Sequence, residues 1–129
     1  MPAINWKDYA PYFRKEEFDC KHTGKNLMRK EFMDVMMQAR VVYQKPIIIT
    51  SGYRDPSHPV ERIKDRPGEH TYGLAADIDV SRVEAMDLMV IFYHLGIRRF
   101  GLDQKGPSRF MHVGLGDKLL GFPQSLWTY

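Results

Sequence analysis

The chain has 129 residues, of which 43% are hydrophobic and 27% charged. This length supports one sizeable core, so we expect a single domain over residues 1–129. The net charge is +3, from 19 Lys and Arg against 16 Asp and Glu, and these charges are scattered along the chain. Nucleic-acid-binding proteins usually gather Lys and Arg on one face, so we expect no nucleic-acid partner.

Export, membrane and disulfide signals are missing from the sequence. The segment MPAINWKDYAPYF has neither a basic start with an apolar run nor a small-residue cleavage site, and no apolar run approaches the ~20 residues of a membrane span. We therefore expect a protein that is made in the cytoplasm without a signal peptide and has no membrane partner. We also expect it to be a monomer. The single cysteine, Cys20, cannot form an internal disulfide, and we interpret it as a buried thiol rather than half of a zinc site with His22.

The first half of the chain predicts a helix, a strand and a long loop. Apolar residues recur at three- and four-residue steps within residues 26–44, which indicates an amphipathic helix. The run PIIIT at 46–50 is typical of a short buried strand. Residues 51–73 are rich in Pro, Gly and charge, and loops of this length in small domains are usually functional.

The second half predicts three strands and one helix. The run LAADIDV at 74–80 indicates a strand, and the pattern from Ser81 to Glu84 predicts a capping box that starts a helix at Ser81. This helix should end near Leu95, because Gly96 can adopt the positive φ of a helix stop. Two short strands, 97–102 and 110–115, follow. The order predicts a small α+β domain, mainly an antiparallel sheet with helices packed on one face.

Alternation along two of these strands brings charged residues together. Asp77 lies opposite the apolar face of its strand, and His112 shares a face with Phe110 and Gly114. If the strands pair, His112 and Asp77 meet on one side of the sheet, where His70 can lean over them. Two imidazoles and one carboxylate suit a catalytic zinc ion with an open fourth position, although histidines that only form hydrogen bonds would give the same spacing.

Several motifs together resemble one enzyme family. They are SGYR at 51–54, the His70-x6-Asp77 element, FMHV at 110–113, the segment FRKEEFDCKHTGKNLM and the final LWTY. In order and spacing they are similar to the zinc peptidases that include D-Ala-D-Ala carboxypeptidases, vancomycin-resistance dipeptidases and phage L-alanyl-D-glutamate endolysins, most closely the short phage and prophage members. The resemblance implies a hedgehog/D-Ala-D-Ala peptidase-like fold.

The resemblance also implies roles for individual residues. His70, Asp77 and His112 fall on the three ligands of a Zn²⁺ cofactor, and Arg54 falls on the catalytic arginine that faces the substrate carbonyl. Tyr53 is a candidate for substrate binding, and Arg109 could bind a substrate carboxylate.

The sequence departs from the family at the expected general base. Arg109 stands where better-known relatives have a carboxylate three residues before the last histidine, and Gly114 stands where many short relatives have aspartate. A hydrolase needs a group that takes and returns a proton. Substitutes in this sequence are Glu69, Asp79, Asp103 and Asp117, of which Asp103 is our first choice because its loop precedes the last strand.

Three functions follow in order of preference. The first is a zinc peptidase, a carboxypeptidase or endopeptidase, that cleaves short peptides of bacterial peptidoglycan as a phage or prophage wall hydrolase. It would act on the wall after release or as a virion component. The second is a non-catalytic relative that keeps the metal and binds wall peptide or a virion partner. The third, a small basic nucleic-acid-binding protein, rests on charge alone.

Overall fold

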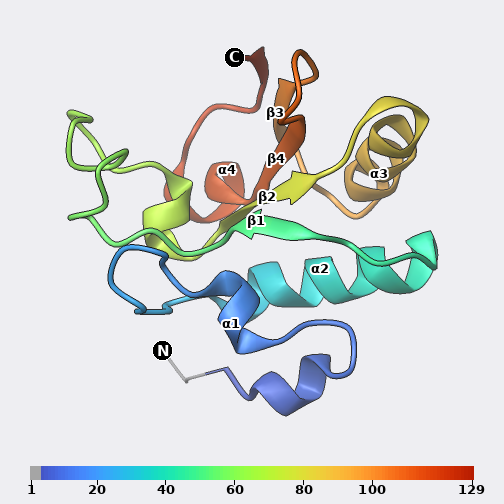
Figure 1. Cartoon of the computed structure of the whole chain (residues 1–129), viewed down its shortest axis with the longest axis horizontal. Helices are drawn as coiled ribbons and strands as arrows, with labels where there is room; N and C mark the ends of the chain where they lie inside the picture. The colour runs from blue at the N-terminus through green and yellow to red at the C-terminus, as the bar shows by residue number, and fades with distance from the viewer. Residues whose placement is uncertain (1–3) are drawn as a thin grey trace.

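The sheet of the computed structural model has the strand order β1-β2-β4-β3-β5 (Figure 1). The structure describes residues 4–129. Paired strands are antiparallel except β3 and β5, which run parallel. The strands are β1 (Ile49–Ser51), β2 (Ala75–Asp79), β3 (Arg99–Asp103), β4 (Phe110–Gly114) and β5 (Ser125–Thr128).

Helices α2 (Lys30–Tyr43) and α3 (Arg82–His94) contact each other and supply side chains to the core on one face of the sheet (Figure 1). Phe32 of α2 and Phe92 of α3 are completely buried. The described residues contain no helix long and apolar enough to cross a bilayer. The shorter helices are η1 (Trp6–Tyr9), α1 (Lys15–Phe18), η2 (Glu69–Tyr72) and α4 (Gly116–Leu120).

Strands β2 and β4 divide the sheet into an apolar face and a polar face. Asp77 pairs directly with His112 in the antiparallel register. Their neighbours Ile78 and Met111 are fully buried in the core with the helices, so alternation turns Asp77 and His112 to the opposite face. The predicted pairing of these two strands is therefore confirmed.

Most predicted elements are present, with shifted ends. The predicted α+β class is confirmed, and the first amphipathic helix, the strand carrying Asp77 and the strand carrying His112 lie where the periodicity placed them. The predicted strand at 46–50 is observed as the shorter β1, which begins three residues later and ends one residue later. Gly96 has the expected positive φ of 98° after α3, and Cys20 is buried, as predicted. The sequence patterns missed β5 and the short helices η1, α1, η2 and α4.

The predicted capping box at Ser81 is wrong. Helix α3 starts at Arg82, but the Ser81 side chain accepts no hydrogen bond from the first turn. The side chain of Gln104 accepts the backbone N–H of Arg82 instead, at 3.2 Å. Glu84 is also engaged elsewhere, because its Oε2 accepts hydrogen bonds from the Tyr43 hydroxyl and the Lys45 ammonium. A tertiary contact therefore replaces the local cap.

Candidate metal centre

Three residues from three elements converge on the polar face of the sheet. His70 lies in η2, Asp77 in β2 and His112 in β4, and all three are buried. The turn after η2 requires Gly73, whose φ is 70° and whose Cα lies so close to the Leu27 carbonyl that a Cβ would overlap it. This turn carries the chain from η2 into β2 and places His70 over Asp77.

The facing atoms of these three side chains form a nearly equilateral triangle. His70 Nε2 lies 3.2 Å from Asp77 Oδ1 and 3.2 Å from His112 Nδ1, and the third edge, from His112 Nδ1 to Asp77 Oδ1, is 3.1 Å. Ligands about 2.0–2.1 Å from a tetrahedral zinc ion lie roughly 3.3 Å from one another. The triangle therefore has the size of one face of a zinc tetrahedron.

Hydrogen bonds behind the two imidazoles determine which nitrogens face the triangle. His70 Nδ1 lies 2.7 Å from the carbonyl oxygen of Gly52, which can only accept, so the ring donates there and Nε2 keeps its lone pair. His112 Nε2 likewise faces the Glu69 carboxylate. Two nitrogen lone pairs and a carboxylate oxygen then point at one another, an arrangement that a cation stabilises. The residues present fit a zinc ion.

The protonation of this group follows from its burial and its charges. Burial lowers the pKa of His70, although Asp77 opposes this. Burial would also lower the pKa of His112, but its hydrogen bonds to Asp77 and Glu69 raise it overall. The pKa of Asp77 is lowered, despite burial, by the two imidazoles. In the metal-free protein a proton on His112 can therefore occupy the place that suits a cation.

Arg54 supports the second oxygen of the aspartate. Its Nη2 donates to Asp77 Oδ2 at 3.1 Å, which leaves Oδ1 for the triangle. Its Nε donates to Ser51 Oγ and its Nη1 to Glu61 Oε2. The guanidinium is thus held from three sides beside the candidate ligands.

Glu61 anchors the long loop at this site. It is 2% exposed and accepts hydrogen bonds from Lys64 Nζ, the Gly68 N–H and Thr71 Oγ1, in addition to Arg54. Burial would raise its pKa, but the hydrogen bonds from Lys64 and Gly68 and the charges of Lys64 and Arg54 lower it to about 2. No sequence pattern pointed to Glu61, because an acid in a charged loop is usually solvated.

The three candidate ligands line a cavity of about 340 Å³. Its walls carry cationic groups, Arg54, Lys64 and Arg99. They also carry aromatic rings, Phe110, Trp127 and Tyr129. The ring of Trp127 lies 5.1 Å from that of His112, and the ring of Tyr129 lies 5.0 Å from that of Phe110. Strand β5 and the residue after it therefore cover one side of the site.

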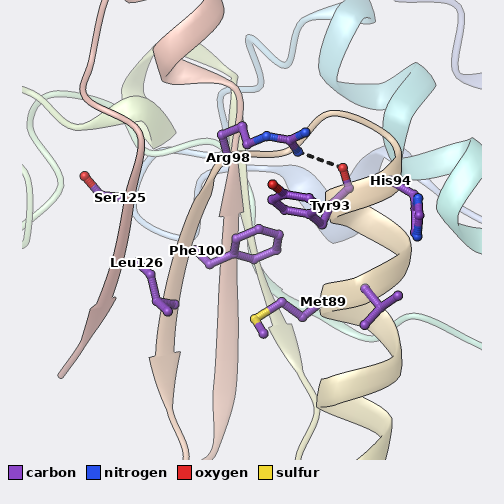
Figure 2. A pocket seen from close by; sticks show the side chains of 8 residues that line it. Met89, Tyr93, His94, Arg98, Phe100, Ser125 and Leu126 are labelled. Atoms are coloured by element: carbon purple, nitrogen blue, oxygen red, sulfur yellow. Dashed lines mark hydrogen bonds between the residues drawn. The ribbon is translucent and has the colours of Figure 1, made fainter.

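A second hollow, of about 440 Å³, lies between α3 and the edge of the sheet formed by β3 and β5 (Figure 2). Met89, Phe100 and Leu126 make it apolar. The guanidinium of Arg98 stacks 3.7 Å above the Tyr93 ring and donates to the Tyr93 carbonyl. His94 is the one imidazole among its lining residues, so this hollow lacks the donor set of the metal centre.

Not every candidate residue reaches the cavity. Arg54 lines it, as do the three candidate ligands. Tyr53 is 3% exposed and packs into the core instead. Arg109 directly precedes β4 and lines a different hollow, with Met86 and Met89.

The first-choice base, Asp103, also lies outside the cavity lining. Asp103 pairs with Phe110, whereas His112 pairs with Gly101. Asp103 therefore lies two residues beyond His112 along the strand direction, a separation of roughly 7 Å. The Asp103 carboxylate accepts the N–H of Lys105 within its own turn. Asp79 and Asp117 do not line the cavity either. Of the four substitutes, the structure brings only Glu69 to it.

A small α+β domain with two imidazoles and one carboxylate around a cation-sized space belongs to the class of candidate metal-dependent hydrolases. The family model Peptidase M15 matches residues 11–114, and the chain belongs to this family. Its members are zinc peptidases that act on peptidoglycan, so the suspected resemblance is confirmed at the level of the family. No curated protein and no solved structure matches the chain.

Proposed function

We propose that this protein is a zinc-dependent peptidase, a carboxypeptidase or endopeptidase, that cleaves short peptides of bacterial peptidoglycan. One observation carries the proposal: three acceptor atoms from His70, Asp77 and His112 face one another at 3.1–3.2 Å in a buried site. Family membership supports both the metal and the class of reaction. The similarity to short phage and prophage peptidases supports a wall hydrolase that acts after release from the cell or as a virion component.

The zinc ion would supply Lewis acidity, which polarises the scissile amide and activates water. Around it the chain fixes its own groups. Arg54 holds Asp77 in place through Oδ2 and lines the cavity with its guanidinium, where a donor can stabilise negative charge that develops on the substrate carbonyl oxygen. Arg54 is therefore our candidate catalytic residue besides the three ligands.

The cavity would suit an acidic peptide once it holds zinc. Its three cationic side chains, Arg54, Lys64 and Arg99, are balanced by the carboxylates that they pair with, so a bound zinc ion would supply the positive charge that attracts a free carboxylate. Trp127 and Tyr129 offer flat apolar surfaces on which the peptide chain can pack. Peptide stems of the bacterial wall carry both free carboxylates and small apolar side chains, so this is the partner that we propose.

One observation favours a second function, a metal-binding relative without catalysis. Of the described residues that line the cavity, Glu69 and Asp77 are the two carboxylates, and both are engaged. Asp77 bonds Arg54 and the imidazoles, and Glu69 bonds His112, Arg99 and the Gly116 N–H. Neither is positioned as a free general base. Such a protein would bind wall peptide or a virion partner through the same cavity.

Metal analysis followed by a cleavage assay tests the two functions. Purified protein should contain about one zinc ion per chain by elemental analysis. Incubation with peptidoglycan fragments should release peptides detectable by mass spectrometry, and His112→Ala should abolish both zinc binding and cleavage. Zinc binding without turnover on any fragment would select the non-catalytic function, and protein that binds no zinc would contradict both.

A further inference from the structure

The carboxylate of Glu69 is buried directly behind one of the candidate ligands. Glu69 is 3% exposed, and its Oε1 lies 2.5 Å from Nε2 of His112, the ring nitrogen that faces away from the triangle. Its Oε2 accepts hydrogen bonds from the Gly116 N–H at 2.8 Å and from Arg99 Nε at 3.1 Å. Arg99 of β3 and the Gly116 N–H of α4 therefore hold the Glu69 carboxylate in place against His112 of β4.

Two glycines provide the space that this carboxylate occupies. A Cβ at position 114 would lie 2.2 Å from Glu69 Cδ, and a Cβ at position 116 would lie 2.6 Å from Oε2. Neither Gly114 nor Gly116 has a positive φ, so the backbone does not require glycine at either position. The Glu69 carboxylate fills the space at position 114, and the carboxylate together with the Phe122 ring fills the space at position 116.

Arg99 is itself held in place and compensates the buried charge. Its side chain is 14% exposed, and its Nη1 donates to the Pro123 carbonyl. Its guanidinium lies 5.0 Å from the centre of the Trp127 ring and 5.3 Å from that of the Phe122 ring. A rigid cation on the far side of Glu69 leaves Oε1 directed at His112.

We propose that Glu69 is the positioning residue of the metal centre. By accepting the Nε2–H of His112, it holds this ring in the tautomer whose Nδ1 lone pair faces His70 and Asp77. Carboxylates behind ligating histidines commonly set ligand orientation in this way. The inference rests on the proposed zinc site, but its test does not depend on peptidase activity.

The variant Glu69→Gln tests the tautomer with little change of shape. In the variant, the amide oxygen should remain with the two donors Gly116 N–H and Arg99, which turns the amide NH₂ toward His112 Nε2. That nitrogen must then accept, so the proton moves to Nδ1. In metal-free protein at alkaline pH, ¹⁵N spectra of the imidazoles should show the Nε2–H tautomer for wild type and the Nδ1–H tautomer for the variant.

Zinc affinity gives the second readout, by competition with a chromophoric chelator. Glu69→Gln should weaken zinc binding about 10–100-fold. Glu61→Gln is the matched control for the tautomer, because Glu61 is an equally buried glutamate whose hydrogen bonds go to Arg54, Lys64, Gly68 and Thr71 and not to an imidazole, so the His112 tautomer should not change. An unchanged tautomer and unchanged zinc affinity in Glu69→Gln would overturn the proposal.

A variant that supplies the carboxylate from a different residue tests whether Glu69 orients His112 or only stabilises the fold. Gly114→Asp alone should destabilise the protein, because its side chain overlaps Glu69. The double variant Glu69→Ala/Gly114→Asp returns a carboxylate to the same space from β4 and should bind zinc more tightly than Glu69→Ala. Zinc binding in the double variant no tighter than in Glu69→Ala would contradict the proposal. If wild type bound no zinc, the proposed function would fail, and the tautomer of metal-free His112 would still decide the role of Glu69.

Discussion

Below its raised pKa, His112 must lose a proton when the site binds zinc. In the metal-free protein the carboxylates of Asp77 and Glu69 raise its pKa above the ordinary 6.5, in spite of burial. Nδ1 must be unprotonated to bind a metal, so zinc binding below this raised pKa releases a proton. We predict that zinc affinity decreases as the pH falls through the pKa of His112, by about tenfold per pH unit. Chelator competition over a pH series measures this, and a pH-independent affinity would contradict it.

Glu61 makes a stability contribution that also weakens as the pH falls, but over a more acidic range. Its pKa decreases from an ordinary 4.5 to about 2 on folding, so its contribution is present above pH 4.5 and is lost as the pH falls toward 2. We predict that Glu61→Gln lowers the free energy of unfolding by about 3 kcal/mol at neutral pH. Urea unfolding of both proteins should show this difference shrinking between about pH 5 and pH 3. A constant difference would show that shape, not charge, stabilises the loop.

At the scale of elements, the sequence predicted the strands that carry the ligands better than the segments that surround them. Along β2 and β4 the apolar residues Ile78 and Met111 alternate with Asp77 and His112, and this period of two predicts that the two polar side chains share a face. β5 was missed because SLWT is short and lies at an edge, where burial imposes little pattern. The place of Glu69 could not be predicted, because its three partners lie 30 or more residues away in sequence.

Gly101 determines how close β5 lies to the metal centre. A Cβ at this position would lie 2.5 Å from Nε1 of Trp127, so the indole packs directly on the strand backbone. We predict that Gly101→Ala displaces Trp127 from the wall of the cavity and raises KM for a peptide substrate more than it lowers kcat, because it disturbs binding and not the ligands. The emission spectrum of Trp127, recorded in a Trp6→Phe background, should shift to longer wavelength. An unchanged spectrum and KM would contradict the prediction.

For the whole molecule, zinc should act as a structural link. The ligands come from η2, β2 and β4, which are separated by up to 42 residues in the chain and which meet only in the folded state. A ligand that binds only the native state adds about 4 kcal/mol at a free concentration 1,000 times its dissociation constant. We predict a rise in Tm on the order of 10 °C when zinc is added to metal-free protein.

Differential scanning calorimetry with zinc and with a chelator measures this change. His112→Ala is the control, because it should retain the fold and lose the response to zinc. An equal rise in Tm for wild type and His112→Ala would mean that zinc binds elsewhere.

The path of the last strand has a practical consequence for handling this protein. Tyr129 lines the cavity, and the chain reaches it through β5, while η1 and α1 lie on the far side of α2 (Figure 1). A polyhistidine tag fused after Tyr129 would begin at the rim of the site, where its imidazoles would compete for the metal and obstruct entry of a peptide. Purification tags and immobilisation chemistry therefore belong at the opposite terminus.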